Sequence, residues 1–274
     1  MKLGRWIATG VLALGAFLMA APFLLMISTS LMTYRQTVAY PPEWIPHPAT
    51  LANYAKALTA TPLLRYFANS LFVAVASVIG QLATGSLAGY AFARLRFRGR
   101  GWLFGAVLAT LMVPIYINIV PLYALMSVLG WVDTYQALIV PGLFGAFGIF
   151  LFRQWFLNLP AELEDAATID GAGPWQIFWH VALPTAVPAI ATLAIFEFLA
   201  AWNTFLWPLV VTNSDATRTL PVGLAMFVAS MKEVTDWGLL MAATAVAVAP
   251  AIAVFAIGQR YFVSGLLDGA VKDA

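Results

Sequence analysis

The chain has 274 residues, of which 62% are apolar and only 9% are charged. With a mean hydropathy of +0.87, too few polar side chains remain to cover a water-soluble domain, so the composition predicts a membrane protein. Fourteen basic residues against twelve acidic ones give a formal charge of +2, which argues against a nucleic-acid partner. The sequence has no Cys and two distant His, so disulfides, thiolate catalysis and metal sites are not expected.

Charged residues divide the sequence into long uncharged stretches, because an ionised side chain in hydrocarbon costs about 2.5 to 3.5 kcal/mol. Each stretch can hold the roughly 20 apolar residues that cross a bilayer. The sequence therefore predicts an all-α membrane protein with six transmembrane helices in a single transmembrane domain, residues 1–274. The six predicted spans are 6–28, 67–93, 102–126, 137–156, 189–211 and 238–259, the fifth containing one acid, Glu197.

The first predicted span follows Lys2 and Arg5 and is longer than the apolar core of about 7 to 15 residues in a secretory signal, so we expect a retained anchor. Basic residues gather in the segments that would then be cytoplasmic, above all in the short turn 94–100. This pattern predicts cytoplasmic N- and C-termini. The predicted outer segments are 29–65, whose prolines favour an ordered cap, the turn near Asp133, and 212–237.

The predicted cytoplasmic loop 158–188, between the fourth and fifth spans, carries clear helix signals. Pro160 suits a first helical turn, and acidic residues follow it near the positive end of the helix dipole. Gly171 stands where a left-handed C-cap belongs, and Pro174 can start a second helix that ends near Pro184. On these signals alone, the loop is two short helices, and an amphipathic hairpin lying on the membrane surface is the favoured interpretation.

A longer motif runs through this loop: Asp165-Ala166-Ala167, three residues, Gly171, nine residues, then Val181-Ala182-Leu183-Pro184. The motif resembles the EAA loop of binding-protein-dependent ABC importer permeases, which is Glu-Ala-Ala, three residues, Gly, nine residues, Ile-x-Leu-Pro. Asp165 replaces Glu and Val181 replaces Ile. Three further stretches, 113–141, 202–209 and 259–272, resemble the carbohydrate branch of that family, with its maltose-like, trehalose-like and glycerol-phosphate-like permeases.

This resemblance implies the permease subunit of an ATP-driven importer of a sugar or oligosaccharide. It implies a bacterial or archaeal cytoplasmic (inner) membrane, surrounding lipid, a companion permease, a dimer of ATP-binding subunits and an extracytoplasmic solute-binding protein. It also implies that the loop is a coupling helix seated on the ATPase, where small residues allow close approach and acidic ones pair with basic partners. The implied coupling residues are Glu164, Asp165, Ala166, Ala167, Asp170, Gly171, Leu183 and Pro184.

A phosphate-binding motif of Gly, four residues and then Gly-Lys-Ser/Thr is absent from the sequence. The chain is therefore not expected to be an enzyme or to bind a cofactor. ATP and Mg²⁺ would be used by the partner ATPase, as the resemblance implies.

Neutral sugars are usually held by amide and carboxylate groups and by aromatic faces in a dry pocket. The candidate substrate-path residues are Tyr116, Asn118, Glu197, Trp202 and Asn203. Pro114 and Pro121 predict an irregular third span around the first two of these. For Glu197, an acid at a subunit interface is an equal alternative, and for Asn203 the alternative is interhelical hydrogen bonding. Gly85 and Gly89 form a small-residue pair that favours helix packing.

The predicted spans have no Lys or Arg in their interiors, which favours a neutral saccharide over a phosphate dianion. Glycerol 3-phosphate or a related polyol phosphate remains an alternative, because the companion permease can supply the cation. A standalone ion-coupled carrier would be supported only by Glu197. An intramembrane enzyme lacks a second acid or base near that residue.

Overall fold

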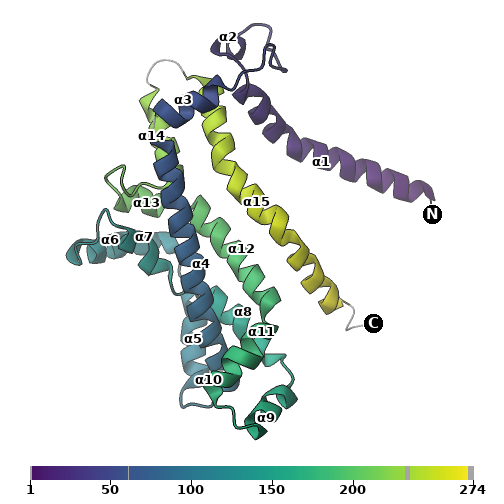
Figure 1. The fold of residues 1–274 in the computed structure, drawn as a ribbon, viewed down its shortest axis with the longest axis vertical. Helices are drawn as coiled ribbons and strands as arrows, with labels where there is room; N and C mark the ends of the chain where they lie inside the picture. The colour runs from purple at the N-terminus through teal and green to yellow at the C-terminus, as the bar shows by residue number, and fades with distance from the viewer. Residues whose placement is uncertain (1, 61, 232–234, 271–274) are drawn as a thin grey trace. The chain divides into compact units, whose positions relative to one another are not determined.

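The structure is a computed structural model that describes residues 2–60, 62–231 and 235–270. All regular elements in these stretches are helices (Figure 1), so the predicted all-α fold is confirmed. The end of the tail stretch 259–272 lies outside the described residues.

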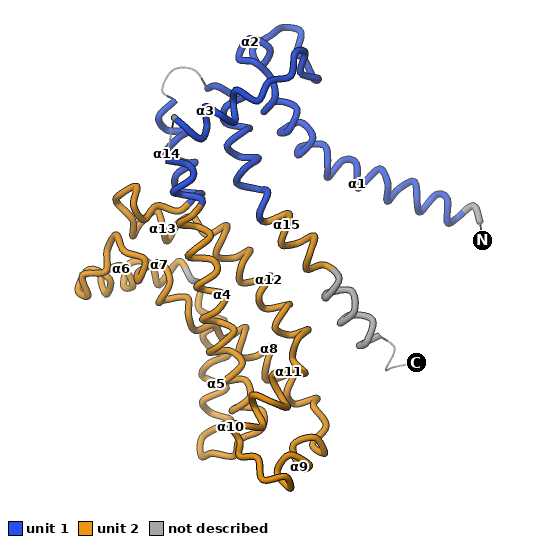
Figure 2. The backbone as a smooth tube through the Cα atoms, in the orientation of Figure 1, with its two compact units in different colours: residues 1–67, 220–250 blue, residues 68–219, 251–274 orange. Residues whose placement is uncertain are grey.

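The chain separates into two compact units, residues 1–67 with 220–250 and residues 68–219 with 251–274 (Figure 2). The predicted inner loop 158–188 falls entirely within the second unit, which therefore holds the candidate site. That residues 1–274 act as one membrane domain stays a prediction.

The first unit is built on hydrogen bonds between side chains and backbone. Its helices are α1 (Lys2–Ser30), α2 (Tyr34–Thr37), α3 (Ala52–Ala60), α14 (Leu220–Ser230) and the first part of α15 (Trp237–Ala270). Buried Asn53 donates to the carbonyls of Ser30 (2.9 Å) and Met32 (2.7 Å) at the end of α1. The hydroxyls of Ser30 and Tyr54 lie 2.8 Å apart. These contacts order the first predicted outer segment, as its prolines indicated.

The second unit contains most of α4 (Leu63–Arg94) and the helices between it and α14. These are α5 (Arg100–Thr110), η1 (Ile115–Asn118), α6 (Ile119–Val128), α7 (Tyr135–Ile139), η2 (Val140–Gly142), α8 (Ala146–Leu157), α9 (Ala161–Ile169), α10 (Pro174–Ile177), η3 (Phe178–Ala182), α11 (Leu183–Thr185), α12 (Val187–Asn203) and α13 (Leu206–Val211). α8 packs against α5 and α12, and α13 packs against α6 and α7 (Figure 1).

Four helical stretches of the described chain are long and apolar enough to cross a membrane: Gly4–Ser30, Leu63–Arg94, Tyr135–Leu157 and Trp237–Gln259. They coincide with the first, second, fourth and sixth predicted spans. A fifth is possible if Pro174–Thr185 and Val187–Asn203, which meet at a bend of 75°, form one broken span. The structure thus supports a multi-pass protein with four or five apolar spans, and the count of six stays a prediction.

The third predicted span, 102–126, is interrupted, as its prolines predicted. α5 ends at Thr110, a 3₁₀ turn follows, and α6 starts at Ile119. Pro114 lacks an N–H and disfavours the helical conformation of the residue before it, which explains the break. The irregularity expected around Tyr116 and Asn118 is observed, since both lie on the 3₁₀ turn η1.

The fifth predicted span, 189–211, is also interrupted. α12 ends at Asn203, Thr204 is extended with φ −63° and ψ 124°, and α13 begins at Leu206. Asn203 Nδ2 donates to the carbonyl of Leu199 (2.7 Å), so the last turn of α12 carries its own hydrogen bond.

α4 and α8 approach closely because the residues between them are small. A Cβ on Gly89 would lie 2.9 Å from the backbone nitrogen of Arg153, and one on Gly85 would lie 3.2 Å from the carbonyl carbon of Gly148. The predicted packing role of Gly85 and Gly89 is therefore confirmed.

The fourth span is interrupted between η2 and α8. Gln81 Nε2 on α4 donates to the freed carbonyl of Gly142 (2.9 Å), and Thr84 Oγ1 donates to that of Leu143 (2.6 Å). Because hydrocarbon offers no hydrogen bonds, a break within an apolar stretch needs such partners, and these two side chains supply them.

Candidate functional site

The inner loop contains the two short helices that its punctuation predicts. α9 starts after Pro160, and Gly171 follows its end with φ +85°. The N–H of Ala172 donates to the carbonyl of Ala167 (2.9 Å), and the N–H of Gly171 to that of Thr168 (3.0 Å), which is the Schellman arrangement. A Cβ on Gly171 would meet nothing within 4 Å. The left-handed backbone alone therefore selects glycine here.

The second helix leads from the loop into α12. Gly173 is its N-cap, and its N–H donates to Gln176 Oε1 (2.9 Å). The helix then passes through the π turn η3, where the Leu183 N–H donates to the carbonyl of Phe178. Pro184 has no N–H for a regular helical bond, which explains a wider turn at this point. α10 to α11 and α12 meet at 75°.

A buried apolar cluster joins this loop to the ends of three helices. Phe152 and Phe156 of α8 and Phe178 of η3 are almost fully buried. The Tyr90 ring of α4 lies 5.5 Å from the Phe156 ring and 5.3 Å from the Phe178 ring. The cluster consists of Tyr90, Ala93, Phe152, Phe156, Leu159, Ile177, Phe178, Ala182, Ala186, Ala189 and Leu193. Close packing of this kind makes the loop and the helix ends one body.

The two faces of α9 differ in what they contact. Glu164 and Ala167 face the body of the unit and are half-buried, whereas Asp165, Ala166 and Asp170 are exposed. Glu164 Oε2 lies 3.5 Å from Arg94 Nε at the end of α4. Among the predicted coupling residues, Glu164 is thus paired inside its own chain.

The three remaining predicted coupling residues differ in how exposed they are. Gly171 and Pro184 are exposed, and Leu183 is half-buried against the apolar cluster.

The exposed face of the loop is more apolar than the sequence predicted. Leu163, Ile169, Trp175 and Trp179, here named the coupling surface, have exposed fractions of 45%, 86%, 62% and 47%. Large exposed apolar side chains gathered on one short segment indicate an interaction site. Helical spacing was the available signal for this exposure. Leu163, Asp165 and Ala166 lie on the sides of α9 that point away from the inward-facing Glu164.

The candidate substrate-path residues do not form one cluster. Tyr116 and Asn118 are exposed on η1, which continues into α6. It is α6 that packs with α13. Glu197, Trp202 and Asn203 lie on α12, which packs with α8 and α11.

The three α12 residues differ in environment. Trp202 is 3% exposed and stacks on Phe198 at 5.6 Å, so it is a packing residue. Asn203 is exposed, and Glu197 is half-buried. In the described part of the chain, the Glu197 carboxylate has neither a hydrogen bond nor an ion pair.

One face of α12, here named the aromatic face, combines Glu197 with uncovered rings. Phe196, Ala200 and Asn203 are exposed at helical spacing beside Glu197. The Phe147 ring of α8 contacts the Phe196 ring at 5.8 Å.

At the break in the fourth span, Phe144 is 72% exposed. Phe144, Phe147 and Phe196 were not among the residues predicted from the sequence. The signal for Phe144 was the Pro141–Gly145 stretch around it.

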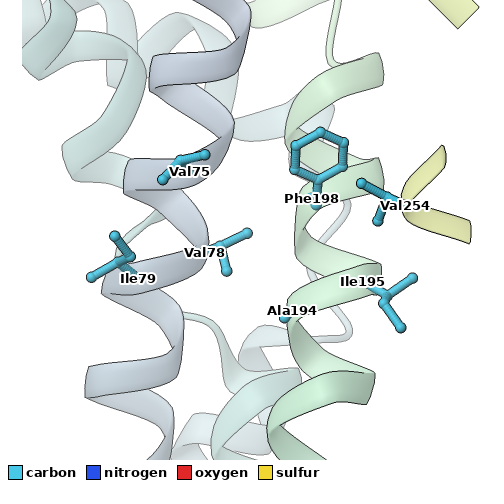
Figure 3. A pocket seen from close by; sticks show the side chains of 7 residues that line it. All are labelled: Val75, Val78, Ile79, Ala194, Ile195, Phe198 and Val254. Carbon is cyan, nitrogen blue, oxygen red and sulfur yellow. The ribbon is translucent and has the colours of Figure 1, made fainter. Parts of the chain in front are cut away.

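A hollow of about 230 Å³ lies between α4, α12 and α15 (Figure 3). Its walls are the side chains of Val75, Val78, Ile79, Ala194, Ile195, Phe198 and Val254. All seven are apolar, so the hollow offers no hydrogen bond to sugar hydroxyls and is not a saccharide site.

At the predicted outer turn, Asp133 organises the loop that follows α13. Its Oδ1 accepts hydrogen bonds from the N–H groups of Asn213 (2.9 Å) and Ser214 (3.1 Å) and from the Thr217 hydroxyl. Partial burial acts to raise the pKa of the Asp133 carboxyl, but these hydrogen bonds outweigh it and lower that pKa to about 2.

Asn69 holds the same outer loop from the side of α4. Its Nδ2 donates to the carbonyls of Ala216 (2.9 Å) and Arg218 (2.8 Å). The Tyr135 hydroxyl donates to Asn69 Oδ1 (2.7 Å).

This chain is similar to a known family of membrane transport proteins. The family described as binding-protein-dependent transport system inner membrane component matches residues 81–268. The arabinooligosaccharides transport system permease protein AraQ of Halalkalibacterium halodurans is 38% identical, with 97% of this chain and 96% of that protein covered. The sn-glycerol-3-phosphate transport system permease protein UgpE of Agrobacterium fabrum is 34% identical, with 97% of each chain covered.

The fold is also that of a solved structure, a bacterial ABC transporter involved in the import of the acidic polysaccharide alginate. The TM-score is 0.87 at 24% identity, with 95% of this chain and 97% of that chain covered. The family match spans more than half of the chain and the two relatives span nearly all of it. The chain therefore belongs to the binding-protein-dependent transport system inner membrane components, the permeases of ABC importers.

Proposed function

We propose that this permease forms the translocation path for a neutral sugar or oligosaccharide together with a companion permease, and that a separate ATPase drives it through the inner loop. The observation that carries the proposal is the coupling surface, an exposed apolar surface mounted on a buried cluster shared with α4, α8 and α12. A rigid mount of this kind passes a push on the loop to the spans.

The choice of a neutral solute is supported by the fact that the cations near the spans are already bound to groups of this chain. Arg153 of α8 is already engaged, because its Nε donates to the carbonyl of Phe92 (3.3 Å) and its guanidinium lies 4.2 Å from the centre of the Phe104 ring. Arg94, at the end of α4, is paired with Glu164. Neither is free to hold a phosphate dianion.

Glycerol 3-phosphate is the second candidate, because a 34% identical relative carries that solute in its name. Uptake into vesicles that contain the complete complex, measured for a panel of saccharides and for glycerol 3-phosphate, separates the two. Uptake that follows a proton gradient without ATPase subunits would instead select an ion-coupled carrier.

We place the chain in a prokaryotic inner membrane with six spans, both termini in the cytoplasm and the inner loop between the fourth and fifth spans. The interrupted stretch from α5 to α6 would then be the third span. The chain has no Cys, so single cysteines report sidedness directly. We expect a membrane-impermeant maleimide on intact cells to label Ser127→Cys but not Arg98→Cys. Labelling of both or of neither contradicts a crossing between them.

We assign ATPase contact to the exposed side of the loop, with ATP and Mg²⁺ used by the ATPase dimer and no cofactor on this chain. The supporting features are the exposed Asp165, Ala166, Asp170 and Gly171 beside the coupling surface. Gly171→Trp is expected to abolish copurification with ATPase subunits. The matched control is Gly99→Trp, since Gly99 is also left-handed (φ +81°) and a Cβ on it also meets nothing within 4 Å.

We assign the solute path to the aromatic face, because aromatic rings suit sugar C–H surfaces while a carboxylate and an amide suit hydroxyls. Glu197→Gln and Phe196→Ala are expected to lower uptake about tenfold while ATPase subunits still copurify. Phe198→Leu, behind this face, is the control. Unchanged uptake in both test variants contradicts the assignment. The solute-binding protein would meet the outer side of the complex.

A further inference from the structure

Arg94 holds the coupling loop at two points. It is the last residue of α4, and its Nη2 donates to the carbonyl of Leu159, where the loop begins. Its Nε lies 3.5 Å from Glu164 Oε2 on the inner face of α9. One guanidinium therefore connects the end of a long span both to the start of the loop and to its first helix.

The Arg94–Glu164 pair is largely removed from solvent. Both side chains are 17% exposed, and Arg94 Nε and Glu164 Oε1 are buried without a hydrogen-bond partner. Removal of either residue would leave the other charge buried and uncompensated. Tyr90, one turn earlier on α4, adds ring contacts with Phe156 and Phe178. The pair thus sits at the edge of the apolar cluster and extends it to α9.

The neighbouring charges do not make the same connection. Arg100 donates to the carbonyl of Leu95 (3.0 Å) within its own turn, and Arg153 contacts α4 and α5. Arg96 and Glu162 are exposed. In the part of the chain that the structure describes, the salt bridge between α4 and α9 is formed by Arg94 and Glu164.

We infer that Arg94 and Glu164 are positioning residues that make α9 and α4 move together, so that a displacement of the coupling loop by the ATPase reaches the second span. The inference rests on the proposed importer function. Loss of the pair would let α9 follow the ATPase without α4. ATP hydrolysis would then continue while less solute is moved per ATP.

A charge-exchange experiment tests this inference in the complete reconstituted complex. Arg94→Glu and Glu164→Arg are each expected to retain solute-stimulated ATPase activity but to lower uptake per ATP about fivefold or more. The double exchange Arg94→Glu/Glu164→Arg should restore uptake per ATP well above either single exchange but below the unmodified complex, because a carboxylate at position 94 rebuilds the ion pair and cannot donate to the Leu159 carbonyl. Arg96→Glu and Glu162→Arg are matched controls expected to change nothing.

A covalent variant covers the case in which single exchanges fail to assemble. Because the chain lacks Cys, Arg94→Cys/Glu164→Cys can be bridged by a short bis-maleimide in the assembled complex. Bridging should raise uptake per ATP about fivefold over the same sample left unbridged. Equal uptake per ATP in bridged and unbridged samples, or a double exchange no better than the single ones, overturns the inference. Absence of ATP-driven uptake by the unmodified complex would contradict the proposed function itself.

Discussion

The predicted inner loop 158–188 and residues 212–219 of the predicted outer loop, both in the second unit, are held in opposite ways. The inner loop rests on a buried aromatic cluster and leaves apolar rings exposed. The outer loop is held by Asp133 and Asn69, whose side chains bond to backbone groups of the loop. The first arrangement suits a dry, tightly packed contact and the second a wet one. Each loop should therefore fail under a different perturbation.

The largest effect is expected in the cluster under the inner loop. Phe156→Ala removes a fully buried ring and should lower the free energy of unfolding by about 3 to 5 kcal/mol. The measurement is the midpoint of thermal unfolding of the complex in detergent. Phe144→Ala is the control, since Phe144 is 72% exposed and its removal should have little effect. Equal midpoint shifts for the two variants would argue against the cluster as the mount.

The next effect is expected at Asp133. Asp133→Ala leaves the N–H groups of Asn213 and Ser214 without their acceptor and should cost about 1 to 3 kcal/mol. Limited proteolysis across 212–219 reports this locally. The inner loop should keep its protection, because the hydrogen bonds of Asp133 go to Asn213, Ser214 and Thr217 of the other loop. Faster cleavage in both loops would show that the two regions are not independent.

Acid should affect the outer loop through the same carboxylate. The folded pKa of Asp133, about 2, lies below its ordinary value of 3.8. Its contribution to stability is therefore complete above about pH 4 and is lost as pH falls toward about 2. Cleavage of 212–219 by an acid-stable protease should rise across that window. Asp133→Asn should remove this pH dependence; if it persists in that variant, another group is responsible.

Gly171 provides a smaller, purely conformational test of the inner loop. Gly171→Ala places a Cβ on a residue at φ +85° and should cost about 1 to 2 kcal/mol. Gly171→Asn should cost less, because Asn tolerates the left-handed region. The Cβ that either change adds meets nothing within 4 Å. Thermal midpoints in the order Gly, Asn, Ala support this account, and equal midpoints contradict it.

Local features of the molecule were predictable from the sequence, whereas contacts between distant segments were not. Gly171 and Pro174 set the helix ends of the inner loop through their own backbone restrictions. Pro114 predicted the irregular third span. The pairing of Arg94 with Glu164 joins residues far apart in the chain, and no local rule specifies it. For this reason Glu164 was expected to face the ATPase.

The aromatic face shows the same limit. Phe147 and Phe196 meet only because α8 and α12 pack together. Hydropathy measured the apolar content of the spans correctly, but composition does not specify which rings a neighbouring helix leaves uncovered.

The smallest effect on stability is expected on the coupling surface. Ile169 is 86% exposed, so Ile169→Ser should change the thermal midpoint very little, within about 0.5 kcal/mol of stability. Its effect on association should be much larger, with affinity for the ATPase subunits reduced about tenfold in a pull-down titration. Leu129→Ser, at an exposed position just after the end of α6, is the control for a general loss of surface apolarity. If Ile169→Ser lowers stability and leaves affinity unchanged, the apolar exposure of the inner loop serves the fold and not a partner.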